Sequence, residues 1–254
     1  MIKIYNKLKI KIYNKLKTVI NRTGSVTWRI QERIDRKMLQ KLHTKSKVFL
    51  EHEGVLSFIE KGDKQELDPG YLKLANLYKL IKARKPKVVL EFGVGFSTVV
   101  MAAALKNNHD MCNRGGHLYT VDAEKHWLNN TENKIPSELK TYVTFHYSPV
   151  KIINLNNQLC SCYESLPNIC PNFVFLDGPS PKSVAGNVRE LSFNNERPIV
   201  AADIMLYESS APLDFFIFVD GRWRNCNFLR NNLKGKYKHI KKNAQKYQSF
   251  EFIE

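Results

Sequence analysis

The feature that most constrains the fold is an apolar run that ends in a glycine turn and a helix. Val88–Phe92 has the composition of a buried strand, and it leads directly into a turn that contains Gly93 and Gly95. A helix is expected from Ser97 to Leu105, with the Ser97 side chain capping its first turn. A strand that passes through glycines into a helix is the opening of an α/β unit, so the sequence predicts a parallel sheet with crossover helices.

Strand and helix patterns then alternate to the end of the sequence. Further strands are expected at 117–121, 143–147, 172–176 and 215–219, followed by a closing pair near 237–241 and 249–253. Helices are expected at 26–42, between Asp68 and Lys85, at 198–208 and at 223–233. The predicted fold is therefore α/β: a Rossmann-like, doubly wound, mostly parallel seven-stranded sheet with a C-terminal antiparallel hairpin.

Positive charge is concentrated in residues 1–48. This segment holds 14 of the 40 Lys and Arg but two of the 24 Asp and Glu, a formal charge of +12 against +4 for the rest. The heptapeptide at 3–9 recurs at 11–17, with apolar residues at helical spacing and lysines along another side. We expect a basic helical extension at 1–48 and one domain at 49–254. Residues 1–20 either contact an anionic membrane or polyanion, or form a solvated helix.

The glycine turn is followed, one strand later, by an acidic residue. Asp122 ends the strand at 117–121, 27 residues after Gly95. A carboxylate there can accept hydrogen bonds from both hydroxyls of a ribose. Gly93 permits a backbone conformation that a β-carbon hinders, and Gly95 lets the backbone approach a ligand. The start of the following helix favours an anionic group, so these residues predict a nucleoside-containing cofactor.

Two details favour a methyl donor over a dinucleotide. Thr98 stands where the dinucleotide fingerprint has its third glycine, and Glu91 precedes the turn inside the strand. This pattern resembles the class I S-adenosylmethionine-dependent methyltransferases, in which an acid precedes a Gly-x-Gly turn and a second acid ends strand two. The resemblance implies S-adenosylmethionine as cofactor. The cofactor-binding residues that it implies are Glu91, Gly93, Gly95, Ser97, Thr98, Asp122, Ala123, Ser148 and Asp177.

Two further acids end core strands at the same edge of the sheet. Asp177 and Asp220 lie in segments, 175–179 and 218–222, that are similar to the small-molecule and sugar O-methyltransferase branch. They are the candidate catalytic residues, and metal-dependent members of that family place their ligands at these strand ends. The pair would then hold a divalent cation such as magnesium. The alternative is that both acids only order their turns, and Gly221 departs from the catechol enzymes' ligand pattern.

The expected function is S-adenosylmethionine-dependent O-methylation of a small hydroxylated acceptor such as a sugar or glycan. One alternative is an RNA methyltransferase that uses the basic extension. The nearly balanced domain and the absence of an Asn/Asp-Pro-Pro-aromatic motif after 172–176 disfavour nucleic acid. Another is a non-catalytic, cofactor-binding scaffold. No apolar stretch approaches the ~18 residues of a membrane span, so a cytoplasmic location, with peripheral membrane contact, is expected.

Overall fold

The computed structural model describes residues 26–60, 70–193, 200–242 and 247–253. The chain divides into two compact units, residues 1–45 and 46–254. The described part of the first unit belongs to α2 (Val26–His52), which confirms the helix expected at 26–42 and extends it. The basic repeat and the membrane contact expected of residues 1–20 lie outside the described residues.

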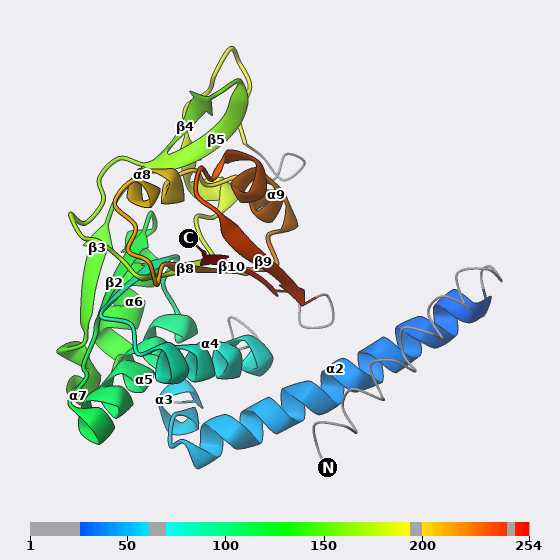
Figure 1. The fold of residues 1–254 in the computed structure, drawn as a ribbon, viewed down its shortest axis with the longest axis vertical. Helices are drawn as coiled ribbons and strands as arrows, with labels where there is room; N and C mark the ends of the chain where they lie inside the picture. Colours follow the sequence, from blue (N-terminus) through cyan, green and yellow to red (C-terminus); the bar gives the residue numbers. More distant parts are fainter. Residues whose placement is uncertain (1–25, 61–69, 194–199, 243–246, 254) are drawn as a thin grey trace. The chain divides into compact units, whose positions relative to one another are not determined.

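The second unit is built on a seven-stranded sheet with the order β3-β2-β1-β6-β8-β10-β9 (Figure 1). The first five strands in this order are parallel, and β10 is antiparallel to both β8 and β9. This is the predicted doubly wound sheet with its closing hairpin. The strands are β1 (Val88–Phe92), β2 (His117–Asp122), β3 (Val143–Tyr147), β6 (Phe173–Leu176), β8 (Phe216–Asp220), β9 (Tyr237–Lys242) and β10 (Tyr247–Phe252).

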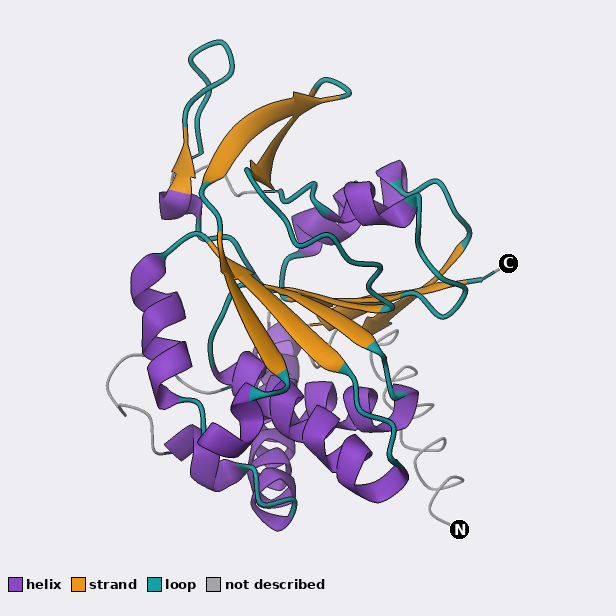
Figure 2. Cartoon of the chain, turned by 90° about the vertical axis from the view of Figure 1, so that its left-hand side faces the viewer, coloured by secondary structure: helices purple, strands orange, loops and turns teal. Residues whose placement is uncertain are grey.

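Helices cover both faces of this sheet, as Figure 2 shows. Along β6, Phe173 and Phe175 belong to one buried cluster, and the alternate residues Val174 and Leu176 belong to the other. This alternation is what the two-residue period of a strand requires of a central sheet. The first cluster includes α3 (Leu56–Glu60), α4 (Tyr71–Arg84), α5 (Phe96–Cys112) and α7 (Ser137–Lys140), and the second includes α8 (Ile204–Glu208) and α9 (Trp223–Asn232).

A second, three-stranded sheet was not predicted. It has the order β5-β4-β7 and consists of β4 (Val150–Leu155), β5 (Gln158–Tyr163) and β7 (Val184–Ala185). Strands β4 and β5 form an antiparallel hairpin whose two-residue turn is Asn156-Asn157, both at positive φ. Paired asparagines between two apolar runs are a hairpin signature, so the sequence did contain this information.

The helix expected at 198–208 is shorter than predicted. Only Ile204–Glu208 is helical within the described residues of this segment. The backbone N–H of Ala201 donates to Asn225 Oδ1, and that of Ala202 donates to the Ser161 carbonyl. These two hydrogen bonds hold residues 200–202 extended beside β5, so their N–H groups are not available to a helix.

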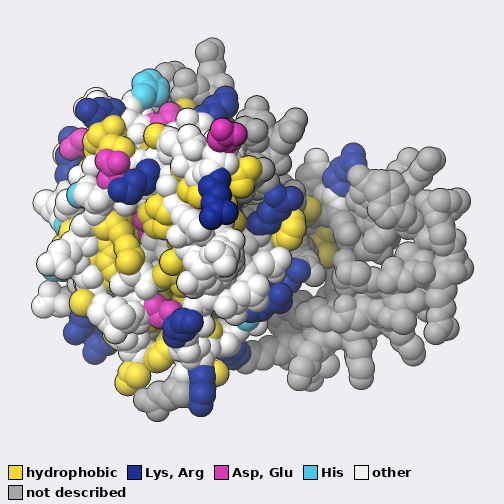
Figure 3. Space-filling model, turned by 90° about the horizontal axis from the view of Figure 1, so that it is seen from above, with side chains coloured by type: hydrophobic (Ala, Val, Ile, Leu, Met, Phe, Trp, Pro, Cys, Tyr) yellow, Lys and Arg dark blue, Asp and Glu magenta, His cyan; other side chains and the backbone are white. Residues whose placement is uncertain are grey.

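Two findings concern the surface and the membrane. In the described residues, no helix is long and apolar enough to cross a membrane. On the face shown in Figure 3, the described Lys and Arg side chains lie scattered among uncharged and apolar ones. This face therefore does not present the continuous basic stripe that is typical of nucleic-acid binding.

Candidate active site

The Glu91 side chain forms hydrogen bonds that hold the elements around the glycine turn together. Its side chain is fully buried and accepts hydrogen bonds from the hydroxyls of Ser97 (2.5 Å), Thr98 (2.6 Å) and Thr120 (2.9 Å). Burial raises the pKa of Glu91 from 4.5 to about 7, although the three hydroxyls act in the opposite direction. The carboxylate thus ties β1 to the first turn of α5 and to the neighbouring strand β2.

The cap expected of Ser97 is a wrong prediction. Helix α5 begins at Phe96 with Gly95 as its N-cap residue, and the Gly95 N–H donates to Thr98 Oγ1 at 3.0 Å. Ser97 therefore lies inside the helix, where its hydroxyl reaches Glu91 instead of the helix end. The Thr98 hydroxyl both accepts from the turn and donates to the buried acid, a role that glycine could not fill.

The two glycines of the turn have different roles. Gly93 has φ +99°, and a β-carbon there would lie 2.8 Å from the amide nitrogen of Gly178. A β-carbon on Gly178 would meet the Gly93 amide at the same distance, so the turns after β1 and β6 pack backbone to backbone. At Gly95 a β-carbon would meet nothing within 4 Å. Gly95 therefore faces open space, as a ligand contact requires.

Asp122 at the end of β2 is held against this turn. Its Oδ2 accepts from the Val94 N–H at 2.9 Å, and its Oδ1 accepts from the Glu124 N–H at 2.8 Å. Burial raises the pKa of Asp122, and these two amides oppose the rise. Each carboxylate oxygen retains a second lone pair for a ligand hydroxyl.

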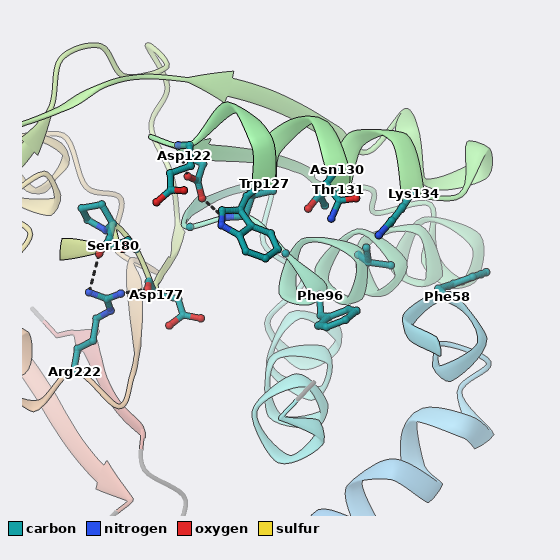
Figure 4. Close-up of a pocket in the computed structure, with 17 residues that line it drawn as sticks. Phe58, Phe96, Asp122, Trp127, Asn130, Thr131, Lys134, Asp177, Ser180 and Arg222 are labelled. Carbon is teal, nitrogen blue, oxygen red and sulfur yellow. Dashed lines mark hydrogen bonds between the residues drawn. The ribbon is translucent and has the colours of Figure 1, made fainter. Parts of the chain in front are cut away.

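These elements enclose a pocket of about 460 Å³. Gly93, Gly95 and Asp122 line it, together with Trp127 of α6 (Lys125–Lys134) and the turn 177–180 after β6. Figure 4 shows Asp122, Trp127 and Asp177 around one end, while Phe96 and Phe58 lie toward the other. Ligand sites occupy roughly 300–1,000 Å³, so the pocket has the size of a small-molecule site.

Asp177 and Asp220 do converge on one edge of the sheet, as expected, but a lysine lies between them. Lys73 Nζ is 2.9 Å from Asp177 Oδ2 and 3.2 Å from Asp220 Oδ2. Burial alone would lower the pKa of Lys73, but the two carboxylates outweigh it and raise that pKa. Burial raises the pKa of Asp220, and Lys73 opposes this. Of the two acids, Asp177 lines the pocket.

Arg222, directly after the β8 turn, supports the same edge. Its guanidinium donates to the carbonyl oxygens of Asp177 and, at 3.2 Å, Pro179. Arg222 also lines the pocket, so it joins the turn after β6 to the turn after β8.

The remaining predicted cofactor residues lie behind the pocket wall. Ser148 is fully buried: its N–H donates to the Asp122 carbonyl, and its hydroxyl accepts from the Ser165 N–H. Ala123 packs against the second buried cluster. Glu91, Ser97, Thr98, Ala123 and Ser148 thus shape the site without lining the pocket, whereas Gly93, Gly95, Asp122 and Asp177 line it. Direct cofactor contact by any of the nine residues stays a prediction.

Sequence reasoning gave neither Lys73 nor Gly178 a role in the site. The lysine belongs to a helix whose pattern shows a buried apolar stripe, and Gly178 was noted only as part of a similar segment. Among the described residues, no group of three or more His, Cys, Asp and Glu side chains is placed to hold a metal ion. The two strand-end acids, with an ammonium between them, do not fit the predicted magnesium site.

Comparison with known proteins assigns the central part of the chain. Residues 90–193 match the model of a family described as "Methyltransferase domain". These residues include the glycine turn, Asp122 and Asp177. No curated protein sequence matches the chain.

Solved structures with a similar fold are distant in sequence. The O-methyltransferase TomG from Streptomyces achromogenes, in complex with S-adenosylmethionine (SAM), is 14% identical, with 84% of this chain and 88% of TomG covered and a TM-score of 0.45. An O-methyltransferase from Bacillus cereus is 12% identical, with 85% and 90% covered and a TM-score of 0.45. Cofactor-bound Rv0187 from MTB is 15% identical, with 78% and 88% covered and a TM-score of 0.48.

The assignment rests on the family match and on the geometry of the turn. The acid beneath Gly-x-Gly, the acid at the end of β2 and the sheet order with its terminal hairpin occur together in one domain. On this evidence residues 90–193 carry a methyltransferase domain, and the glycine turn with its two acids lies within it.

Proposed function

We propose that the protein transfers the methyl group of S-adenosylmethionine to a hydroxyl group of a small acceptor such as a sugar or glycan. One observation carries this proposal: Gly95, Asp122 and Asp177 line a single pocket at the carboxyl edge of the parallel strands. Ligands of open α/β sheets bind at this edge. The pocket thus brings a ribose-type acid and a second acid, suited to a hydroxylated acceptor, to one place.

The residues divide into a cofactor end and an acceptor end. Asp122 is placed to accept the ribose hydroxyls, and the Trp127 ring on α6 offers a flat apolar surface to a base. When bound, S-adenosylmethionine supplies a methyl group already activated by its sulfonium. The chain itself then has to orient the acceptor, exclude water and receive one hydroxyl proton. Asp177, on the pocket wall, is the candidate for the last task.

Calorimetric titration tests the cofactor part of this proposal. We expect S-adenosylhomocysteine and S-adenosylmethionine to bind, and NAD not to bind. Asp122→Ala should weaken binding by about tenfold or more, because two charge-assisted hydrogen bonds to the ribose would be lost. Asp110→Ala is the control, since this acid pairs with Lys106 on the exposed side of α5. A folded protein that binds neither S-adenosylmethionine nor S-adenosylhomocysteine would refute the proposal.

A screen of sugars and glycans with a radiolabelled methyl donor tests which class of acceptor the protein methylates.

We further propose that residues 1–20 bring a cytoplasmic enzyme to an anionic membrane, because lysines 3, 7, 11 and 15 repeat at four-residue spacing. Flotation of the full chain with phosphatidylserine vesicles tests this. The same chain with those four lysines changed to glutamine should lose most of the binding, and equal flotation would contradict it.

A further inference from the structure

The strand-end acids of the site enclose an ammonium group that belongs to the chain itself. Lys73 lies in the first turn of α4, and its Nζ donates to Oδ2 of Asp177 and contacts Oδ2 of Asp220. The three side chains are 24–31% exposed, so the cluster is partly shielded from solvent. A partly shielded carboxylate pair is stabilised by such a cation, because two like charges held close together repel each other.

The Lys73 ammonium occupies the position between the two carboxylates that a divalent ion would take. The geometry does not allow the ammonium and a divalent ion to occupy this position together. Hard cations bind oxygen ligands at roughly 2.0–2.6 Å and take about six to eight of them. Here two carboxylates converge, the described residues supply no third acid, and the Lys73 amine lies within 3.2 Å of both. The Lys73 ammonium, held between the two carboxylates, would also repel an incoming cation.

The charges around this cluster are already balanced. Arg222 donates to the backbone carbonyl of Asp177, which adds a second fixed cation beside the two acids. Lys73 and Arg222 together offset Asp177 and Asp220, so a divalent ion added beside Lys73 would leave an excess of positive charge. Within the described residues, Lys73 is the one donor to the Asp177 carboxylate. Its contact holds Oδ2 of Asp177 on the Lys73 side of the group.

We propose that Lys73 takes the place of a catalytic metal ion: its ammonium holds Asp177 and Asp220 in their working orientation, and the acceptor binds at metal-free carboxylates. The statement about the acceptor rests on the proposed O-methylation, whereas the statement that Lys73 stands in the place of a metal ion does not. Lys73 is in this sense a positioning residue that acts through Asp177. The inference predicts that removal of the ammonium converts the acid pair into a divalent-cation site.

Manganese titration, followed by electron paramagnetic resonance of free Mn²⁺, tests this without any methyl acceptor. The wild-type protein is expected to show no saturable binding up to about 1 mM Mn²⁺, the weak end of protein carboxylate sites. Lys73→Met should bind one Mn²⁺ at least about tenfold more tightly than wild type. Lys73→Met/Asp220→Asn should lose this gain, because one of the two carboxylates is gone.

Lys82→Met is the matched control. Lys82 belongs to the same helix, is similarly exposed (29%) and contacts a single carboxylate, that of Glu53, at 2.9 Å. Its loss should leave Mn²⁺ binding as weak as in wild type. Mn²⁺ should also restore melting temperature to Lys73→Met but not to Lys82→Met, a rescue that a merely structural lysine would not show.

Two results would overturn the inference. One is saturable Mn²⁺ binding by wild type that Asp220→Asn abolishes; the other is a folded Lys73→Met that gains no Mn²⁺ binding. If Lys73→Met fails to fold, Lys73→Arg keeps a cation and decides the matter: it should bind no Mn²⁺, and binding would refute the proposal. Failure of the cofactor proposal would instead appear as absent S-adenosylhomocysteine binding, with the Mn²⁺ results unchanged.

Discussion

The buried carboxylate of Glu91 makes a specific prediction about how stability depends on pH. The side chain is completely buried, and its pKa is raised from 4.5 to about 7 by that burial. A carboxyl group whose pKa is higher in the folded state stabilises the fold while it is protonated. That contribution is fully present below the unfolded pKa and is lost as the pH rises through the folded pKa.

The size of the effect follows from the two pKa values. A difference of 2.5 units between 4.5 and about 7 corresponds to about 3 kcal/mol in total, and about 2.5 kcal/mol of this falls between pH 5 and pH 8. Glu91→Gln has the same shape and no charge to bury. Its amide can donate to the Ser97 hydroxyl, which can rotate to accept.

Urea denaturation followed by circular dichroism, from pH 5 to pH 8, measures this difference. The free energy of unfolding of Glu91→Gln should rise relative to wild type by about 2–3 kcal/mol over that interval. Glu53→Gln is the control, because the Lys82 hydrogen bond lowers the pKa of Glu53. Its pH-dependent contribution is lost below the unfolded pKa of 4.5, so the Glu53→Gln difference should stay nearly constant from pH 5 to pH 8. A Glu91→Gln difference that stays constant with pH, or that shrinks as the pH rises, would refute the reasoning.

Four other changes probe the pocket wall and a second buried acid. Gly178→Ala should cost about 1–3 kcal/mol of stability, because its β-carbon would lie 2.8 Å from the facing turn. Gly95→Ala meets no protein atom within 4 Å, so it should stay within about 1 kcal/mol of wild type in urea denaturation and instead weaken S-adenosylhomocysteine binding in calorimetry. Asp203→Asn should stabilise the protein increasingly from pH 5 to pH 8, since burial raises the pKa of Asp203 to about 7; a constant difference in denaturation midpoint would contradict this. Arg222→Met should reduce S-adenosylhomocysteine affinity by about tenfold, because the guanidinium anchors the 177–179 turn of the pocket wall, and unchanged affinity would show that the turn holds without it.

The main sheet could be predicted because its central strands are short, apolar and bounded by breakers. Strands β1 and β3 begin and end where the pattern placed them, and the other five differ by a residue or two. The second sheet was missed although its Asn156-Asn157 turn is a hairpin signature. The apolar runs on either side are interrupted, since β4 carries Lys151 and Asn154, and the burial of β5 depends on contacts with residues 200–202. Such contacts are tertiary and cannot be read from local pattern.

The site was predictable in part for the same reason. Glu91 stands beside the glycine turn in the sequence, and Asp122 ends the next strand. The parallel register of β1 and β2 brings Asp122 to the turn. Ser97 was misassigned because a helix start can shift by one residue, and here the Gly95 N–H is satisfied by Thr98. The approach of Gly178 to Gly93 depends on how two neighbouring strands end, which no local motif records.

Lys73 is the harder case, and chain direction explains both its place and how it could have been found. Helix α4 leads into β1 through a three-residue connection, so it runs antiparallel to the strands that it covers. Two contacts with β8 demonstrate this: Arg84, at the end of α4, stacks on Phe216 at the start of the strand, and Lys73 reaches Asp220 at the strand's end. The first turn of a helix that precedes a parallel strand therefore comes to the carboxyl edge, where ligands bind. A lysine in that turn, facing two strand-end acids, is better interpreted as part of the site than as a solvated charge, although 104 residues separate it from Asp177.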